Sequence, residues 1–180
     1  MDTLDDFTLV QQVTAFHDKR SFDRLVVKYQ SPIRRFFLSQ TLGDKELSDD
    51  YAQDTFVKAY LHLSQFKGES AFSTWLFRIA YNVFYDATRR KKETSDIDTP
   101  TVMNRQSQSS DEPLRMDLYA ALDLLSETER LCISLQLMEG ESIDTIVEIT
   151  GMANGTVKSH LFRGKQKMAA YLKQNGYGGK

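Results

Sequence analysis

Cysteine, histidine and proline are scarce in this chain of 180 residues, which has one Cys, three His and three Pro. A single cysteine excludes an internal disulfide. Cys132 stands among aliphatic residues, so we expect it to be a small, buried apolar side chain. The three histidines are far apart in the sequence and lack the spacing of metal ligands. We therefore expect neither a metal site nor a cofactor.

Long apolar runs are also missing, and none approaches the roughly 20 residues that a membrane-spanning helix needs. Met1 is followed by Asp2, Asp5 and Asp6, in place of the basic and apolar stretches of a secretory leader. These two absences favour a protein of the reducing cytoplasm. The sequence shows no nucleophile paired with a base and no phosphate-binding loop, so enzymatic activity is not expected.

Alternating strand patterns are almost absent, and apolar residues recur instead at the helical spacings of three and four. One such run starts at Leu4 and a second at Phe22. Pro32 lies inside the second run and predicts a kink or a break near Gln30–Ser31, because proline lacks the N–H that the helix requires.

Two further helices are expected in the first half of the chain. One covers Leu47–Ser64, with Asp44 as its N-cap, and the other covers Ala71–Lys92, with Ser70 as its N-cap. Four helices with short connections predict a small bundle at residues 1–92.

Residues 93–112 differ in composition from the rest, being rich in Ser, Thr, Asp and Gln and poor in large apolar side chains. Such a segment cannot bury enough surface to offset its ordering entropy, so it predicts a flexible linker. Helical spacing resumes at residues 113–180. The predicted fold class is therefore all-α, with two small helical domains joined by a linker.

The stretch 66–92 contains seven aromatic residues and six Lys or Arg. Aromatic faces mixed with cations suit the binding of bases and phosphates of a nucleic-acid strand. Wound as a helix, its second part places Arg78, Asn82, Asp86 and Arg89 on the face opposite the apolar residues. For any single ring, burial in the core is the commoner explanation, but the segment as a whole favours nucleic acid.

A helix-turn-helix is predicted near the C-terminus. Gly140 ends one helix, Ser142 can cap a short helix that runs through Thr150, and Gly151 supplies the turn. Asn154 is expected to cap the second helix, which runs to about residue 172. Residues 151–180 carry six Lys or Arg and no Asp or Glu, although the whole chain has a net charge of −2.

The second helix of this unit has the pattern of a recognition helix, with polar and basic side chains opposite an apolar face. Arg163 is the best candidate for a bidentate contact to guanine, and Ser159 for a shorter polar contact. Lys158, Lys165 and Lys167 are expected to bind phosphates. The alternative is an amphipathic helix whose basic face is only solvated.

Three motifs resemble those of the extracytoplasmic-function (group IV) sigma factors of bacterial RNA polymerase. The family pattern F-x-G-x-S-x-F-x-T-W-L-x-R-I-A-x-N matches residues 66–82, and the pattern of acidic residues leading into Q-E-x-F matches residues 49–56. The C-terminal pattern E-G-x-S followed by G-T-V-K-S-x-L-x-R matches residues 139–163. The chain departs from the family pattern at Leu47, Tyr51, Thr145 and Val147.

The resemblance implies a sigma factor that binds core polymerase, recognises the −10 and −35 promoter elements, and promotes DNA melting. The first domain would contact the −10 element through Phe66, Lys67, Gly68, Ser70, Trp75, Arg78, Asn82, Asp86, Arg89 and Arg90. The second would contact the −35 element through Thr156, Lys158, Ser159, His160, Phe162, Arg163, Lys165 and Lys167. Core polymerase would be bound by Asp49, Asp50, Gln53, Asp54 and Phe56.

The same resemblance implies several partners. They are the β′ clamp and β flap of core RNA polymerase, promoter DNA as duplex and as melted single strand, and an anti-sigma factor that could hold the protein at the inner membrane. Otherwise the protein would be found in the cytoplasm, at the nucleoid. It would not itself be a membrane protein.

There are two alternatives to this function. A LuxR-type transcription regulator shares a run like Thr156–His160 after a similar turn, but it would need a receiver or ligand-binding domain in front. A small helical RNA-processing or nucleotide enzyme would need convergent histidine or carboxylate chemistry, which the sequence does not show.

Overall fold

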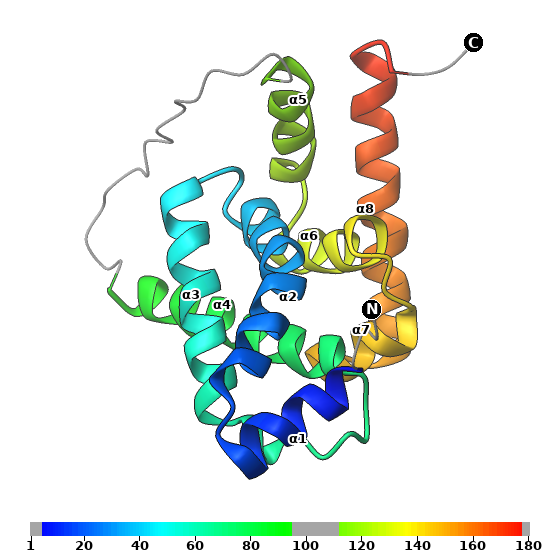
Figure 1. The fold of residues 1–180 in the computed structure, drawn as a ribbon. Helices are drawn as coiled ribbons and strands as arrows, with labels where there is room; N and C mark the ends of the chain where they lie inside the picture. Colours follow the sequence, from blue (N-terminus) through cyan, green and yellow to red (C-terminus); the bar gives the residue numbers. More distant parts are fainter. Residues whose placement is uncertain (1–4, 95–111, 178–180) are drawn as a thin grey trace. The chain divides into compact units, whose positions relative to one another are not determined.

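The computed structural model describes residues 5–94 and 112–177, and this part of the chain is built from helices and their connections (Figure 1). The predicted all-α fold class is confirmed. The N-terminal half contains α1 (Asp6–Phe16), α2 (Lys19–Gln40), α3 (Lys45–Leu61), the 3-10 turn η1 (Leu63–Gln65) and α4 (Phe72–Thr94). The C-terminal half contains α5 (Glu112–Asp123), α6 (Glu127–Ile133), the π-helical segment η2 (Ser134–Met138), α7 (Ile143–Thr150) and α8 (Asn154–Gln174).

The contacts divide the described residues into two compact units. Residues 5–35 and 49–94 form the first, and residues 36–48 and 112–177 form the second. The segment 36–48, which comprises the end of α2, the following turn and the start of α3, belongs to the second unit. There the Arg130 guanidinium donates to the carbonyl of Gln40 at 3.1 Å. The predicted boundary at residue 92 stays a prediction, and the predicted linker at 93–112 lies almost wholly outside the described residues.

The core of the first unit lies where α2, α3 and α4 face one another. Helix α4 crosses α3 in Figure 1 and buries the side chains at every third or fourth position of one face. Phe72, Leu76, Ala80 and Val83 are at most 3% exposed, as the helical spacing predicts. Ile79 and Ala87, at helical spacing on the same apolar side of α4, are only half-buried.

Helix α2 runs without interruption through Pro32, so a break near Gln30–Ser31 is excluded, while the alternative of a kink there stays a prediction. Proline inside a helix removes one hydrogen bond and costs about 3 kcal/mol. Packing on both sides of the proline offsets this cost, because Leu25 is 1% exposed and Ile33 is fully buried.

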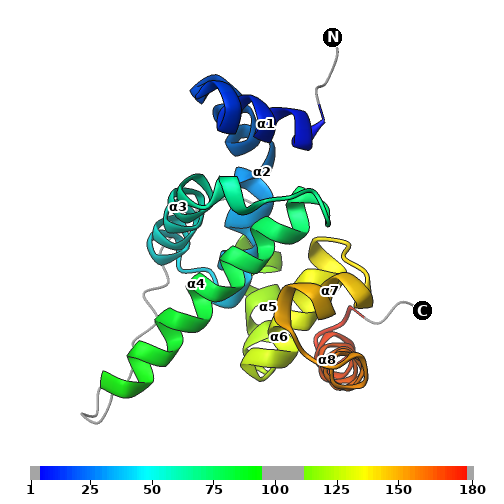
Figure 2. The ribbon, with the colours of Figure 1, turned by 90° about the horizontal axis from the view of Figure 1, so that it is seen from below.

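Helix α8 is the centre of the second unit, and α5, α6 and α7 pack around it (Figure 2). Val157, Leu161 and Gly164 form its buried face, as predicted, while Met168 and Leu172 are half-buried. Cys132 of α6 is fully buried, which confirms its predicted role as an apolar core residue.

Three of the predicted helix caps are confirmed, whereas the helix predicted at Leu47–Ser64 runs from Lys45 to Leu61. The Asp44 carboxylate accepts from the backbone N–H of Leu47 at 3.0 Å, and α3 follows at Lys45. Ser142 caps α7 by accepting from the N–H of Thr145 at 3.1 Å. Gly151 ends α7 with φ 72°, a conformation in which glycine avoids the strain of a Cβ.

Two predicted caps are wrong. Helix α4 begins at Phe72, so Ser70 stands too early to cap it, and its hydroxyl donates to the carbonyl of Ala71. Helix α8 begins at Asn154, with Ala153 at the cap position and no side-chain cap. The amide of Asn154 instead donates to the Asp144 carboxylate at 3.2 Å.

Candidate nucleic-acid interface

An aromatic cluster fixes the loop that leads into α4. The ring of Phe66 meets Phe72 at 5.4 Å between centroids with an interplanar angle of 89°, and it meets Trp75 at 5.5 Å. Tyr29 of α2 adds a fourth ring, 5.4 Å from Phe72. Phe66 is 8% exposed and Trp75 is half-buried, so both residues shape this loop from inside. Of the rings predicted to contact DNA here, Phe66 is mainly core.

A pocket of about 230 Å³ opens beside this cluster, between the loop and the start of α1. The loop bends at Gly68, whose φ of +75° suits glycine. The ring of Phe7 lies directly on Gly68, since a Cβ there would be 2.7 Å from the Phe7 Cε2 atom. The residues that line the pocket are Asp5, Asp6, Phe7, Phe66, Gly68, Ser70, Ala71 and Phe72.

The contribution of α1 to this pocket was not predicted. Asp6 accepts from the Lys28 ammonium at 2.7 Å and from the Tyr29 hydroxyl at 2.5 Å, which ties the start of α1 to α2. Asp5 caps α1 by accepting from the N–H of Thr8 at 2.7 Å. Hydrogen bonding to Thr8, through its side chain first and its backbone N–H second, lowers the pKa of Asp5. No local pattern could have revealed the pocket wall, because residues 5–7 meet residues 66–72 only in the folded chain.

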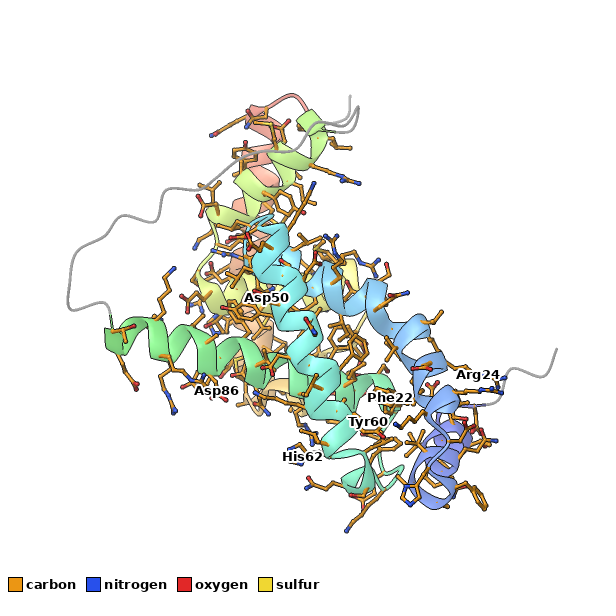
Figure 3. The ribbon with its side chains drawn as sticks, turned by 60° about the vertical axis from the view of Figure 1, so that its left-hand side comes forward. Phe22, Arg24, Asp50, Tyr60, His62 and Asp86 are labelled. Carbon is orange, nitrogen blue, oxygen red and sulfur yellow. The ribbon has the colours of Figure 1, made fainter. Side chains whose placement is uncertain are left out.

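The outer face of α4 presents the polar and basic side chains that the helical spacing predicts. Arg78, Asn82, Arg89 and Arg90 are exposed, and Asp86 is half-buried on the same helix (Figure 3). Arg89 forms an i,i+4 ion pair with Glu93 at 3.7 Å. Lys67 is exposed on the loop before the helix and Ser70 is half-buried there. The predicted residues of the first domain thus gather on one loop and one helix.

The residues predicted to bind polymerase lie along α3. Asp50 and Gln53 are exposed, and Asp50 stands on α3 well away from Tyr60 (Figure 3). Asp49 pairs with Arg34 of α2 at 2.5 Å, and Asp54 pairs with Lys58 one turn later at 3.3 Å. Asp49 and Asp54 therefore already have cationic partners within the first unit.

An apolar groove of about 410 Å³ lies between α2 and the second half of α3, and the sequence analysis missed most of it. The Phe22 and Tyr60 rings, which line it, meet edge to face at 5.0 Å (Figure 3). Val57 is 50% exposed and Leu61 68%, and because both line the same groove they form a contiguous apolar patch with it. The groove is completed by Val26, Gln53 and Phe56, and the last two are predicted polymerase contacts.

The helix-turn-helix of the second unit consists of α7, the turn at Gly151 and α8. Seven of the eight predicted DNA contacts on α8 are exposed: Thr156, Lys158, Ser159, Phe162, Arg163, Lys165 and Lys167. His160 is half-buried. Burial, followed by the charge of Arg163, lowers the pKa of His160, which favours the neutral ring at physiological pH.

Two of these cations have an internal partner that the sequence analysis did not identify. Glu129 of α6 is 4% exposed, and its carboxylate lies 2.7 Å from the Lys167 ammonium and 3.4 Å from Nε of Arg163. The spacing of Ser126 and Glu129 could have predicted the capping box that the two residues form. It could not have predicted an ion pair with side chains more than thirty positions later in the chain.

No helix within residues 5–94 and 112–177 combines the length and the apolar character needed to cross a bilayer. Nor do three or more His, Cys, Asp or Glu side chains come together there in a way that could hold a metal ion.

Two models of known protein families match the chain, one in each half. The model of Sigma-70 region 2 matches residues 25–94, and the model of Sigma-70 region 4 matches residues 115–168. The pocket and the outer face of α4 lie mainly in the first match, and the helix-turn-helix lies in the second. Residues 5–7 of the pocket wall lie before the region 2 match.

Curated relatives match over nearly the whole chain. The ECF RNA polymerase sigma-E factor of Escherichia coli K12 is 32% identical, over 92% of this chain and 93% of its own. The RNA polymerase sigma-H factor of Pseudomonas aeruginosa is also 32% identical, over 89% of this chain and 90% of its own.

Solved structures agree with this assignment. The sigma factor RpoE of Bartonella quintana, solved in complex with the anti-sigma factor NepR, has a TM-score of 0.73 and 27% identity, covering 86% of this chain and 98% of its own. CnrH, solved with the cytosolic domain of CnrY, has a TM-score of 0.74 at 24% identity. The match covers 95% of this chain and 99% of CnrH, and this likeness supports the fold. On the match of both regions and the near-complete coverage by relatives, the chain belongs to the ECF family of RNA polymerase sigma factors.

Proposed function

We propose that this sigma factor docks on core RNA polymerase through the groove on α3, opens the −10 promoter element with α4 and the loop before it, and reads the −35 element with α8. The observation that carries the proposal is the pairing of two different surfaces in one chain. One combines an aromatic-walled pocket with a polar and basic helix face, and the other is a helix-turn-helix.

The first surface suits a melted strand. Bases that leave the duplex stack lose stacking energy, and a pocket with aromatic walls can replace part of it. The pocket of about 230 Å³ has Phe7, Phe66 and Phe72 in its wall and an open loop backbone at Gly68. Arg78 and Arg89, exposed on α4, are placed to bind phosphates of the same strand, and the Asn82 amide has the donor and acceptor that a base edge needs.

The second surface suits an intact duplex. Recognition helices present the side chains of their first turns to base edges in the major groove. Thr156, Lys158 and Ser159 occupy this position on α8 and are exposed. Asp144 holds the Asn154 amide and so joins the start of α8 to α7. Arg163 follows one turn after Ser159 and is the proposed reader of a guanine.

The groove on α3 suits a protein partner. Its exposed aliphatic residues would be covered in a complex, as expected for the centre of an interface, and its rim carries Gln53 and the acidic residues of α3. We assign it to the β′ clamp of core polymerase, and α5–α8 to the β flap.

Regulation by an anti-sigma factor is part of the proposal. The relative from Bartonella quintana was solved with such a partner, and covering the groove on α3 would block the docking of polymerase. A sigma factor also acts where RNA polymerase acts, so we place the protein in the cytoplasm, at the nucleoid.

In vitro transcription with purified core polymerase tests the proposal. The protein added to core enzyme alone should give promoter-specific transcripts, with permanganate-reactive thymines over the −10 element. A LuxR-type regulator would instead require a sigma factor already present. The free protein should bind promoter duplex only weakly, because its net charge is −2. Transcription that depends on an added sigma factor would refute the proposed function.

A further inference from the structure

A buried carboxylate lies directly behind the exposed face of α8. The Glu129 side chain is 5% exposed, and its Oε2 atom accepts from the Lys167 ammonium at 2.7 Å and from the N–H of Ser126 at 3.0 Å. Its Oε1 atom lies 3.4 Å from Nε of Arg163. A charge is rarely buried to this degree unless it is paired, and here both partners belong to the proposed DNA-reading helix.

Gly164 explains how Glu129 reaches both cations. It is buried where α6 meets α8, and a Cβ at this position would be 2.7 Å from Ile133 Cγ1 and 3.7 Å from Glu129 Cβ. The missing side chain lets the two helices approach closely. Arg163 and Lys167 are one turn apart on α8, on either side of this crossing point, so a single carboxylate can meet both.

Two contacts restrain the Arg163 side chain, although it is 54% exposed. Nε faces the Glu129 carboxylate, and a terminal nitrogen, NH2, lies 3.2 Å from Nδ1 of His160, which accepts when that ring nitrogen carries no proton. Guanine is read by two parallel N–H groups directed at its O6 and N7 atoms. A guanidinium held through Nε and one N–H of NH2 still has three N–H groups on its terminal nitrogens with which it could contact a base edge.

We propose that Glu129 is a positioning residue for base recognition, which orients Arg163 toward a guanine of the −35 element. The inference rests on the proposed function of α8. It assigns to α6 a direct influence on sequence specificity, although α6 is not the recognition helix. Fixing the side chain before binding reduces the rotamer entropy lost when Arg163 engages the base.

A purely electrostatic role for Glu129 makes a different prediction. A carboxylate that only repels DNA would lower the affinity for every sequence alike, and its removal would raise binding without changing base preference. A positioning role affects the ratio between the correct and the incorrect base. This ratio is therefore the quantity to measure.

The experiment uses the full-length protein assembled with core polymerase, and promoters in which each upstream base pair is replaced in turn. Glu129→Gln removes the charge but keeps an oxygen for the capping box, which accepts Glu or Gln at this position. Glu127→Gln is the matched control, because it removes one carboxylate from an exposed position of the same helix. Arg163→Ala is the reference for complete loss of the reader.

We expect Glu129→Gln to reduce discrimination at one guanine on the order of tenfold, at the base pair where Arg163→Ala also loses it. Glu127→Gln should discriminate like the unmodified protein. Combining Glu129→Gln with Arg163→Ala should cause no further loss, because both changes remove the same interaction. This lack of additivity separates positioning from a general weakening of the fold.

The inference is overturned if Glu129→Gln discriminates normally while Arg163→Ala does not, or if the two losses are additive. Full discrimination by Arg163→Ala would also overturn it, since no reader would remain for Glu129 to position. The proposed function fails in a different way, which is the absence of promoter-specific transcription by the unmodified protein with core polymerase.

Discussion

Replacing Gly68 by alanine tests the geometry of the pocket beside α4. The backbone of Gly68 is left-handed, with φ +75°, and the new Cβ would be 2.7 Å from the Phe7 ring. A residue with a Cβ costs about 1–2 kcal/mol in this conformation. The Phe7 ring must also move, which disturbs its edge-to-face contact with Phe66 and costs about 0.5–1.5 kcal/mol more.

The expected loss is thus about 1.5–3.5 kcal/mol in the free energy of unfolding of the first unit. The chain has a single tryptophan, and Trp75 lies in the same aromatic cluster, so its fluorescence reports on this unit. With a urea dependence of about 2 kcal/mol per M, the midpoint should fall by about 1 M. Promoter opening by the Gly68→Ala holoenzyme should slow in parallel.

Phe7→Ala provides the control, because it removes the ring that the new Cβ would meet. In the Phe7→Ala background, Gly68→Ala should lower the free energy of unfolding only by the strain of the left-handed backbone, about 1–2 kcal/mol. An unchanged urea midpoint for Gly68→Ala would refute the left-handed conformation of residue 68. An equal cost with and without Phe7 would refute the contact between the ring and the glycine.

Three further predictions follow from exposure and charge. Leu61→Glu should weaken the binding of core polymerase by tenfold or more in a pull-down or fluorescence titration, as expected for a charge placed in an apolar interface. The control is Phe16→Glu, at a side chain that is 79% exposed and lies outside the groove, and this variant should bind normally. Equal binding by the two variants would show that the groove is not the docking site. Burial raises the pKa of the Cys132 thiol to about 11, so only about one thiol in a thousand is ionised at pH 8. Native protein should therefore react with a thiol reagent only as fast as it unfolds. Rapid labelling would contradict the burial of Cys132. Burial raises the pKa of Glu129, but the hydrogen bonds and charges of Lys167, Ser126 and Arg163 outweigh it, so the folded pKa lies below the ordinary value. The ionised Glu129 therefore stabilises the fold fully above the unfolded pKa of about 4.5, and this stabilisation is lost as the pH falls through the folded pKa. Glu129→Gln should thus lose less free energy of unfolding than the unmodified protein between about pH 5 and 3. Urea unfolding followed by far-UV circular dichroism measures this difference. The same acid sensitivity in both proteins would count against the ion pairs.

Local signals predicted the helices and many of their ends. Asp44, Ser142 and Gly151 act within three or four residues of their positions, so the sequence carries all the information that these caps require. The same holds for the buried face of α8, where Val157 and Leu161 repeat at helical spacing. The two wrong predictions, Ser70 and Asn154, each lie one residue from the observed N-cap position, which is Ala71 for α4 and Ala153 for α8.

The continuity of α2 and the π-helical segment Ser134–Met138 could not be predicted in this way. Local propensity favours a break at Pro32, and only the burial of the helix on both sides reverses that preference. Most of the predicted site residues are exposed, but Phe66 is mainly core, and five are half-buried: Phe56, Ser70, Trp75, Asp86 and His160. The roles of all of them in binding stay predictions.

The sequence by itself determined the helical periodicity, the turn of the helix-turn-helix and the motifs that identify the family, because each depends on residues close together in the chain. Only the tertiary structure decided which side chains wall the pocket, which apolar residues stay open on α3, and which carboxylate meets Arg163. These features join residues such as Phe7 and Gly68, or Glu129 and Lys167, that are distant in sequence. Contacts of this kind arise from the packing of whole helices, and no short stretch of sequence specifies them.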